Sequence, residues 1–156
     1  MEFYMLVLAL DTTTRRGSVT LARDGVELES YTGDEGITHG QRLPGDLVRV
    51  LDRRKLTVRD VDLFAVAVGP GSFTGLRIGI ATMQGLALAN GKSIIGVSAL
   101  DALHHASRST LTPRLRAPRS GEARRSQAKA AYPLPLRSAV ATWMDAQRGE
   151  VFSALY

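Results

Sequence analysis

The stretch DLFAVAVGPGSFTGLRIGIATMQGLALANG, residues 62–91, decides the fold of this chain. Residues 63–68 form an apolar run without polar alternation, which is typical of a strand buried on both faces of a sheet. The glycines that follow permit backbone angles closed to other residues, and Ser72 or Thr74 can cap a helix start. The stretch therefore predicts a strand, a glycine turn and a helix, and the turn consists of Gly69, Pro70, Gly71, Ser72, Thr74 and Gly75.

The predicted helix carries apolar side chains on two faces. A helix advances about 100° per residue, so residues three or four apart share a face. A helix that lies on a sheet needs only one such face, and the second is explained by burial inside the domain or by contact with a partner. One face holds Leu76, Ile80, Met83 and Ala87, and the opposite face holds Ile78, Ala81, Gly85, Leu88 and Ala89.

The flanking residues add four strands and two helices to this unit. We expect strands at residues 6–10, 18–22, 26–31 and 93–97, with a hairpin turn at Asp24-Gly25 between the second and third. A helix is predicted over residues 40–54, with its regular part starting at Pro44, and another over residues 99–106 after Ser98. The apolar stripe of the first of these helices consists of Leu43, Leu47, Val50 and Leu51.

Length and composition favour one globular domain without disulfides. A chain of 156 residues can bury one real core. No run of 18 apolar residues predicts a membrane span, and the start, with Glu2 and no basic segment, does not predict a signal peptide. The chain has no cysteine, which excludes thiolate metal sites and fits a cytoplasmic protein.

The net charge of +5 comes from one segment. Residues 108–138 carry eight basic side chains, one acidic side chain and four prolines, and they predict a disordered basic linker. An arginine-rich tract can also bind RNA phosphates, and this alternative stays open. The linker divides a first lobe, residues 1–107, from residues 139–156, which predict a hairpin that starts an incomplete second lobe.

The sequence resembles the TsaB (YeaZ) family over about residues 5–107 and 139–156. The resemblance is carried by GPGSFTGLRIGIATMQGLA at 69–87, LALDTTT at 8–14, HGQRLP at 39–44, GVSALDAL at 96–103 and DAQRGEVF at 145–152. It implies an α/β fold, the N-terminal lobe of an actin-like ATPase (ASKHA), with element order β-β-β-α-β-α-β-α and a mixed five-stranded sheet.

The resemblance also implies a function. The family's members are non-catalytic subunits that bind TsaD, with TsaE and ATP, in the synthesis of tRNA N6-threonylcarbamoyladenosine. It implies a homodimer when the chain is alone, contact with tRNA only through the complex, no membrane, and no cofactor bound by this chain alone, with ATP held in the complex. The implied partner interface consists of Leu43, Leu47, Leu51, Ile78, Ala81, Gly85 and Leu88.

Nucleotide chemistry is one alternative. Related kinases bind phosphate at a hairpin, so this chain could be a phosphotransferase lobe, although Thr13 stands where a glycine is common. Asp11 is equally explained as a residue that forms the turn. A dinucleotide site at residues 69–75 lacks the expected acidic residue, because none follows before Asp101. The vestigial phosphate hairpin consists of Asp11, Thr12, Thr13 and Thr14.

A metallopeptidase is the weaker alternative. In the paralogue TsaD two histidines four residues apart hold a metal, and the resemblance places Ala99 and Leu103 at those positions. His104 and His105 are adjacent on a helix and point about 100° apart, so they do not replace that pair. The sequence predicts no metal site and no catalytic residue.

Overall fold

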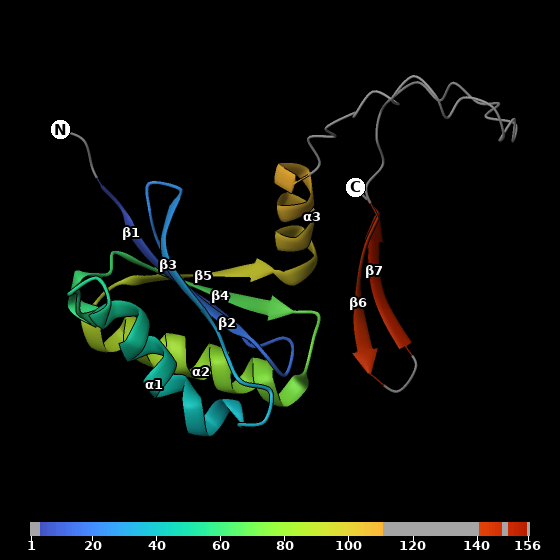
Figure 1. The fold of residues 1–156 in the computed structure, drawn as a ribbon, viewed down its shortest axis with the longest axis horizontal. Helices are drawn as coiled ribbons and strands as arrows, with labels where there is room; N and C mark the ends of the chain where they lie inside the picture. Colours follow the sequence, from blue (N-terminus) through green and yellow to red (C-terminus); the bar gives the residue numbers. More distant parts are fainter. Residues whose placement is uncertain (1–3, 111–140, 148–149, 156) are drawn as a thin grey trace, which may run out of the picture.

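A mixed five-stranded sheet forms the centre of the fold (Figure 1). The computed structural model describes residues 4–110, 141–147 and 150–155. The strand order is β3-β2-β1-β4-β5, in which β1–β2 and β2–β3 are antiparallel and β1–β4 and β4–β5 are parallel. The predicted α/β class, element order and sheet are confirmed. The strands are β1 (Leu6–Asp11), β2 (Ser18–Arg23), β3 (Val26–Thr32), β4 (Leu63–Gly69) and β5 (Ser93–Ser98).

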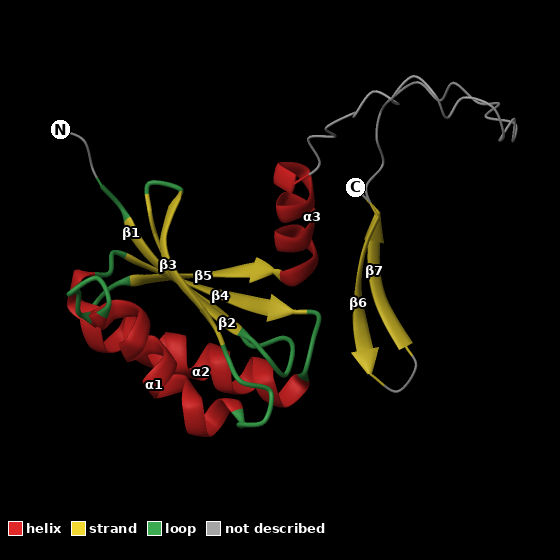
Figure 2. Cartoon of the chain, viewed as in Figure 1, coloured by secondary structure: helices red, strands yellow, loops and turns green. Residues whose placement is uncertain are grey.

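Two helices cover one face of this sheet, α1 (His39–Asp52) and α2 (Phe73–Asn90), and they lie side by side (Figure 2). A short 3-10 helix, η1 (Val58–Asp60), precedes β4, and α3 (Ala99–Thr110) follows β5. Helix α1 begins at His39 and contains Pro44, so the expectation of a regular start at Pro44 is wrong. The first turn is held because His39 and Arg42 bind carbonyl oxygens of the β1–β2 turn.

The core lies between the sheet and these two helices. The apolar stripe of α1, from Leu43 to Leu51, is buried there, and so are Met83 and Ala87 of α2. Leu76 and Ile80, from the same predicted face of α2, are half-buried. The prediction that β4 is buried on both faces holds for residues 64–66 and fails at Val68, which is half-exposed near the sheet edge. Helices therefore do not cover both faces along the whole strand.

The second described part is a hairpin of β6 (Ala141–Gln147) and β7 (Glu150–Leu155), which lies beside α3 (Figure 1). The predicted hairpin is confirmed. Helix α3 continues to Thr110, beyond both its predicted end and the predicted lobe boundary at residue 107. The rest of the predicted linker lies outside the described residues. Among the described helices, none is long and apolar enough to cross a membrane.

Glu29 ties the outer strand β3 to the end of α1. Its carboxylate accepts a 2.7 Å hydrogen bond from Arg53 Nη1 and lies 3.5 Å from Arg54 Nε. The hydrogen bond from Arg53 is the main reason that the pKa of Glu29 lies below its ordinary value of 4.5, and the charges of both arginines add to it. The ionised carboxylate therefore favours the folded state.

We expect this contact to make folding pH-dependent. A group with a lowered folded-state pKa stabilises fully above about pH 4.5, and the contribution is lost as pH falls through the lower folded-state value. Glu29→Gln should therefore flatten the loss of urea stability between about pH 5 and pH 3. Glu27→Gln, on the same strand, is the control. Equal acid dependence in wild type and Glu29→Gln would contradict the assignment.

Candidate functional site

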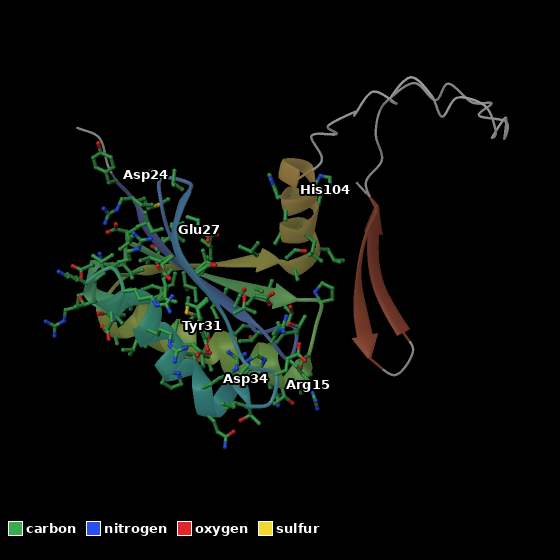
Figure 3. All side chains as sticks on the ribbon, in the orientation of Figure 1. Arg15, Asp24, Glu27, Tyr31, Asp34 and His104 are labelled. Carbon is green, nitrogen blue, oxygen red and sulfur yellow. The ribbon has the colours of Figure 1, made fainter. Side chains whose placement is uncertain are left out.

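The candidate site is the turn between β1 and β2, residues 11–17, where the vestigial phosphate hairpin was predicted. Arg15 of this turn lies beside the N-terminal ends of α1 and α2 (Figure 3). Asp11 Oδ1 accepts a 2.7 Å hydrogen bond from the Thr13 amide, the contact expected of a turn-forming aspartate. Thr14 Oγ1 accepts from the Gly17 amide at 3.3 Å, and Gly17 has a φ of 56°.

The glycine turn and α2 press against this hairpin. The Ser72 amide donates to the Thr13 carbonyl oxygen at 2.7 Å. A Cβ added at Gly71 would lie 2.7 Å from the Thr13 Cα, and one at Gly75 or Gly79 would collide with Thr12. Glycine is required at these positions because no side chain fits between the helix and the hairpin.

The structure also shows which of the two predicted residues, Ser72 or Thr74, caps α2. Ser72 Oγ accepts from the Gly75 amide at 3.3 Å, whereas Thr74 is exposed, so Ser72 is the cap of α2. Gly69 has a φ of 106°, a backbone angle that favours glycine. The glycine-turn prediction therefore correctly located the turn, and the structure adds that the turn packs on the hairpin.

Thr12 and Thr13 lie within this contact. Both residues are buried, and within the described part of the chain neither hydroxyl has a hydrogen-bond partner. The carbonyl oxygen of Thr13 accepts the hydrogen bond from the Ser72 amide. The carbonyl oxygen of Thr12 lies where a Cβ atom at Gly75 would have to be placed. The backbone of Thr12 and Thr13 is therefore not available to a phosphate on the α2 side, although a cavity of about 420 Å³ lies beside Arg15 and Ser72.

The opposite face of the sheet holds a cavity of about 340 Å³ between the strands and α3. Asp11 and Ser18 line it where the hairpin begins, and six alanines from the sheet and α3 form much of its wall. Ala99 and Leu103, the positions aligned with the metal-binding histidines of TsaD, also line this cavity. The cavity thus brings Asp11 of the predicted hairpin together with the two positions aligned with the TsaD histidines, and its walls are mostly apolar.

The N-terminal turn of α1 forms hydrogen bonds with the outer side of the hairpin. His39 Nε2 donates to the Thr14 carbonyl oxygen at 2.8 Å, and His39 Nδ1 accepts from Arg42 Nη2 at 2.9 Å. The Arg42 guanidinium also donates to the Arg16 carbonyl oxygen and pairs with Asp46. We call His39, Arg42 and Asp46 the latch. Sequence reasoning missed the contact of His39 with the hairpin.

The predicted partner interface needs correction on α1. Leu43, Leu47 and Leu51 are buried in the core because the apolar stripe of α1 faces the sheet, so their side chains do not form an outer surface. The predicted interface residues on α2 are more accessible: Ala81, Gly85 and Leu88 are exposed, and Ile78 is half-buried.

The outer side of α1 presents other residues. Pro44, Gly45 and Val48 are exposed, and the side chain of Val48 is 53% exposed. Sequence reasoning missed them, although an apolar residue such as Val48, outside the buried stripe, was the available signal. We call Pro44, Gly45, Val48, Ala81, Gly85 and Leu88 the α1–α2 face.

The residues that the structure describes contain no set of side chains suited to binding a metal ion. There, no group of three histidine, aspartate or glutamate side chains could hold a metal ion. His104 and His105 stand with their ring centroids 6.3 Å apart in an edge-to-face arrangement. His39 belongs to the latch, so it does not join them.

Comparison with known proteins identifies relatives. A family model described as "TsaD: tRNA N6-adenosine threonylcarbamoyltransferase" matches residues 36–131. The "tRNA threonylcarbamoyladenosine biosynthesis protein TsaB" of Escherichia coli is 40% identical over 96 residues, which cover 62% of this chain and 41% of that protein. The protein of the same description from Haemophilus influenzae is 36% identical over 102 residues, which cover 65% of this chain and 43% of that protein.

A solved structure agrees with this result. YeaZ from Pseudomonas aeruginosa superposes with a TM-score of 0.72 at 31% identity, covering 97% of this chain and 59% of that chain. The sheet, its two covering helices and the β1–β2 hairpin define an actin-like ATPase lobe. The chain belongs to the family of the TsaD model, and its relatives place it among the TsaB (YeaZ) members. It spans less than half the length of the curated relatives named here.

The glycine contact can be tested by adding a single methyl group. Gly75→Ala should lower the free energy of unfolding by about 1–3 kcal/mol, because the methyl would collide with backbone rather than with a flexible side chain. Gly85→Ala is the matched control on the same helix, since its Cβ would meet nothing within 4 Å. The control should gain up to about 1 kcal/mol in urea unfolding. Equal effects of the two substitutions would refute the contact.

The latch makes a second prediction about stability. The side chains of Arg42 and Asp46 are each only 7% exposed, so Arg42→Met would leave a buried carboxylate without its partner. We expect a loss of about 3–5 kcal/mol in urea unfolding. The double variant Arg42→Met/Asp46→Leu should lose less than Arg42→Met alone, because it leaves no buried charge. A single variant that loses under about 1 kcal/mol would argue against a buried pair.

Proposed function

We propose that this chain is a TsaB-type binding subunit in the biosynthesis of tRNA threonylcarbamoyladenosine, and that it docks on TsaD through the α1–α2 face. The observation that carries the proposal is the exposed apolar surface of that face. Leu88 is 85% exposed, and Val48 is half-exposed on the neighbouring helix. A monomeric domain usually buries such side chains, and exposed apolar patches often mark sites of protein contact.

The shape of the α1–α2 face suits another pair of helices. Cβ atoms added at Gly45 and Gly85 would meet nothing within 4 Å, so both positions are open and flat. Small residues let the backbones of two helices approach closely, and the larger Val48 and Leu88 supply apolar area. When the chain is alone, the same face would pair with a second copy.

The chemistry of the cavity supports a role without catalysis. Ala99 and Leu103 present only apolar atoms where TsaD carries metal ligands, so this chain would leave the transfer reaction to TsaD. We propose that TsaE and ATP join the assembly of the two proteins. The tRNA would then contact this chain only through the complex.

One observation favours the alternative of a nucleotide-binding phosphotransferase lobe. Asp11 and Ser18 line the 340 Å³ cavity, on the side of the hairpin that α2 leaves open. Calorimetric titration of the full chain with Mg-ATP discriminates between the two functions. Heat of binding that Asp11→Asn abolishes would favour the nucleotide site over the binding subunit.

The docking proposal predicts the effect of charge on the α1–α2 face. Leu88→Asp should abolish measurable binding to TsaD in sedimentation or calorimetry, because docking would bury the new carboxylate without a partner. Gly85→Leu should weaken binding by holding the helices apart, with little change in thermal stability. Val26→Asp, which alters an exposed apolar residue of β3, is the control. Unchanged affinity of both α2 variants would rule out this face.

A further inference from the structure

The two edges of the sheet are built differently. Strands β3 and β5 are the outermost strands, so each has one side without a neighbouring strand in the described sheet. Strand β3 carries Glu27 and Glu29, and its pairing with β2 is interrupted by a register shift (Glu27 is labelled in Figure 3). Arg54 also donates to the Leu28 carbonyl oxygen. Charges, irregular pairing and a covering side chain are the usual protection of an edge strand.

Strand β5 is less protected: its pairing with β4 also shifts register, between Ala67 and Gly69, but the strand itself carries no charge. Its sequence, SIIGVS, contains no charged residue and no proline, and Ser93, Ile95 and Gly96 are exposed. Figure 2 shows it as the outer strand beyond β4. Such a strand presents unpaired amide and carbonyl groups to any chain that can add to the sheet.

Apolar side chains flank this edge on both faces of the sheet. Ile95 is 46% exposed and lies opposite Ala65 in the pairing of β4 with β5, on the cavity face. Val68 of β4 is 50% exposed on the other face, where a Cβ at Gly96 would lie 2.7 Å from it. A strand added beside β5 would therefore gain main-chain hydrogen bonds and cover apolar area on both faces.

We propose that β5 pairs antiparallel with β5 of a second copy of this chain, so that one continuous sheet crosses both copies. A two-fold axis makes this contact closed and self-complementary. An uncharged strand can meet itself without placing like charges opposite each other, which β3 with its two glutamates cannot do.

This contact goes beyond the proposed function because it uses a different surface. The α1–α2 face lies on the helix layer, whereas β5 is at the edge of the sheet (Figure 1). A chain with two independent two-fold contacts forms assemblies larger than a dimer, and blocking either contact leaves dimers. A partner bound at the α1–α2 face would leave the β5 contact free to join two such complexes.

The test is sedimentation velocity of the full chain over a range of concentrations. Leu88→Asp blocks the α1–α2 face, and this variant should still form a reversible dimer. Adding Ile95→Lys should convert it to a monomer, because two lysines would face each other across the pair. Adding Ser30→Lys to the exposed position on β3 is the matched control and should leave the dimer. A Leu88→Asp variant that is monomeric at every concentration, or an Ile95→Lys addition without effect, would overturn the proposal.

A second measurement does not depend on how Ile95→Lys folds. Amide hydrogen exchange of residues 93–98 in Leu88→Asp should slow as the protein concentration rises, because pairing occupies the outer amides. Exchange independent of concentration would overturn the β5 contact. Failure of the β5 contact can be distinguished from failure of the proposed function. A comparison of TsaD binding by wild type and by Ile95→Lys tests only the α1–α2 face.

Discussion

The contact between α2 and the β1–β2 hairpin is the constraint on which the rest of the lobe depends. Gly71 of the turn and Gly75 of the helix lie against backbone atoms of Thr13 and Thr12, and Gly79 lies against the Thr12 side chain. This contact fixes α2 on the sheet, closes one side of the hairpin, and leaves the other side open to the alanine-lined cavity. The α1–α2 face exists because α2, anchored on this side, turns Ala81, Gly85 and Leu88 outwards.

The fold was predictable from the sequence because its signals are local. The apolar run at residues 63–68, the glycine turn and the two-residue hairpin at Asp24-Gly25 each depend on neighbours in the chain. The helix starts were less predictable, because His39 and Arg42 hold the first turn of α1 through contacts with residues 14–16, far away in sequence. Boundaries that depend on tertiary contacts are not encoded in periodicity.

The structure divides the residues predicted for the partner interface into buried ones on α1 and mostly exposed ones on α2. A stripe of leucines on α1 can equally face a sheet or a partner, and periodicity does not distinguish the two. The structure assigns Leu43, Leu47 and Leu51 to the core, and the smaller residues Pro44 and Gly45 lie outside. On α2 the glycines at 75 and 79 identify the sheet-facing side, which leaves Gly85 and Leu88 on the other.

The latch has a consequence for which substitutions the hairpin tolerates. Arg42 binds the carbonyl oxygens of Arg15 and Arg16, not their side chains, so many residues at 15 and 16 would preserve the same contacts. Gly17 and Gly33 have no such freedom, since a Cβ at either position would collide with the latch or the backbone beside it. Amino-acid differences among related sequences should therefore be most frequent at residues 15 and 16. We expect substitutions to occur together, or not at all, at Gly17, Gly33, His39, Arg42 and Asp46.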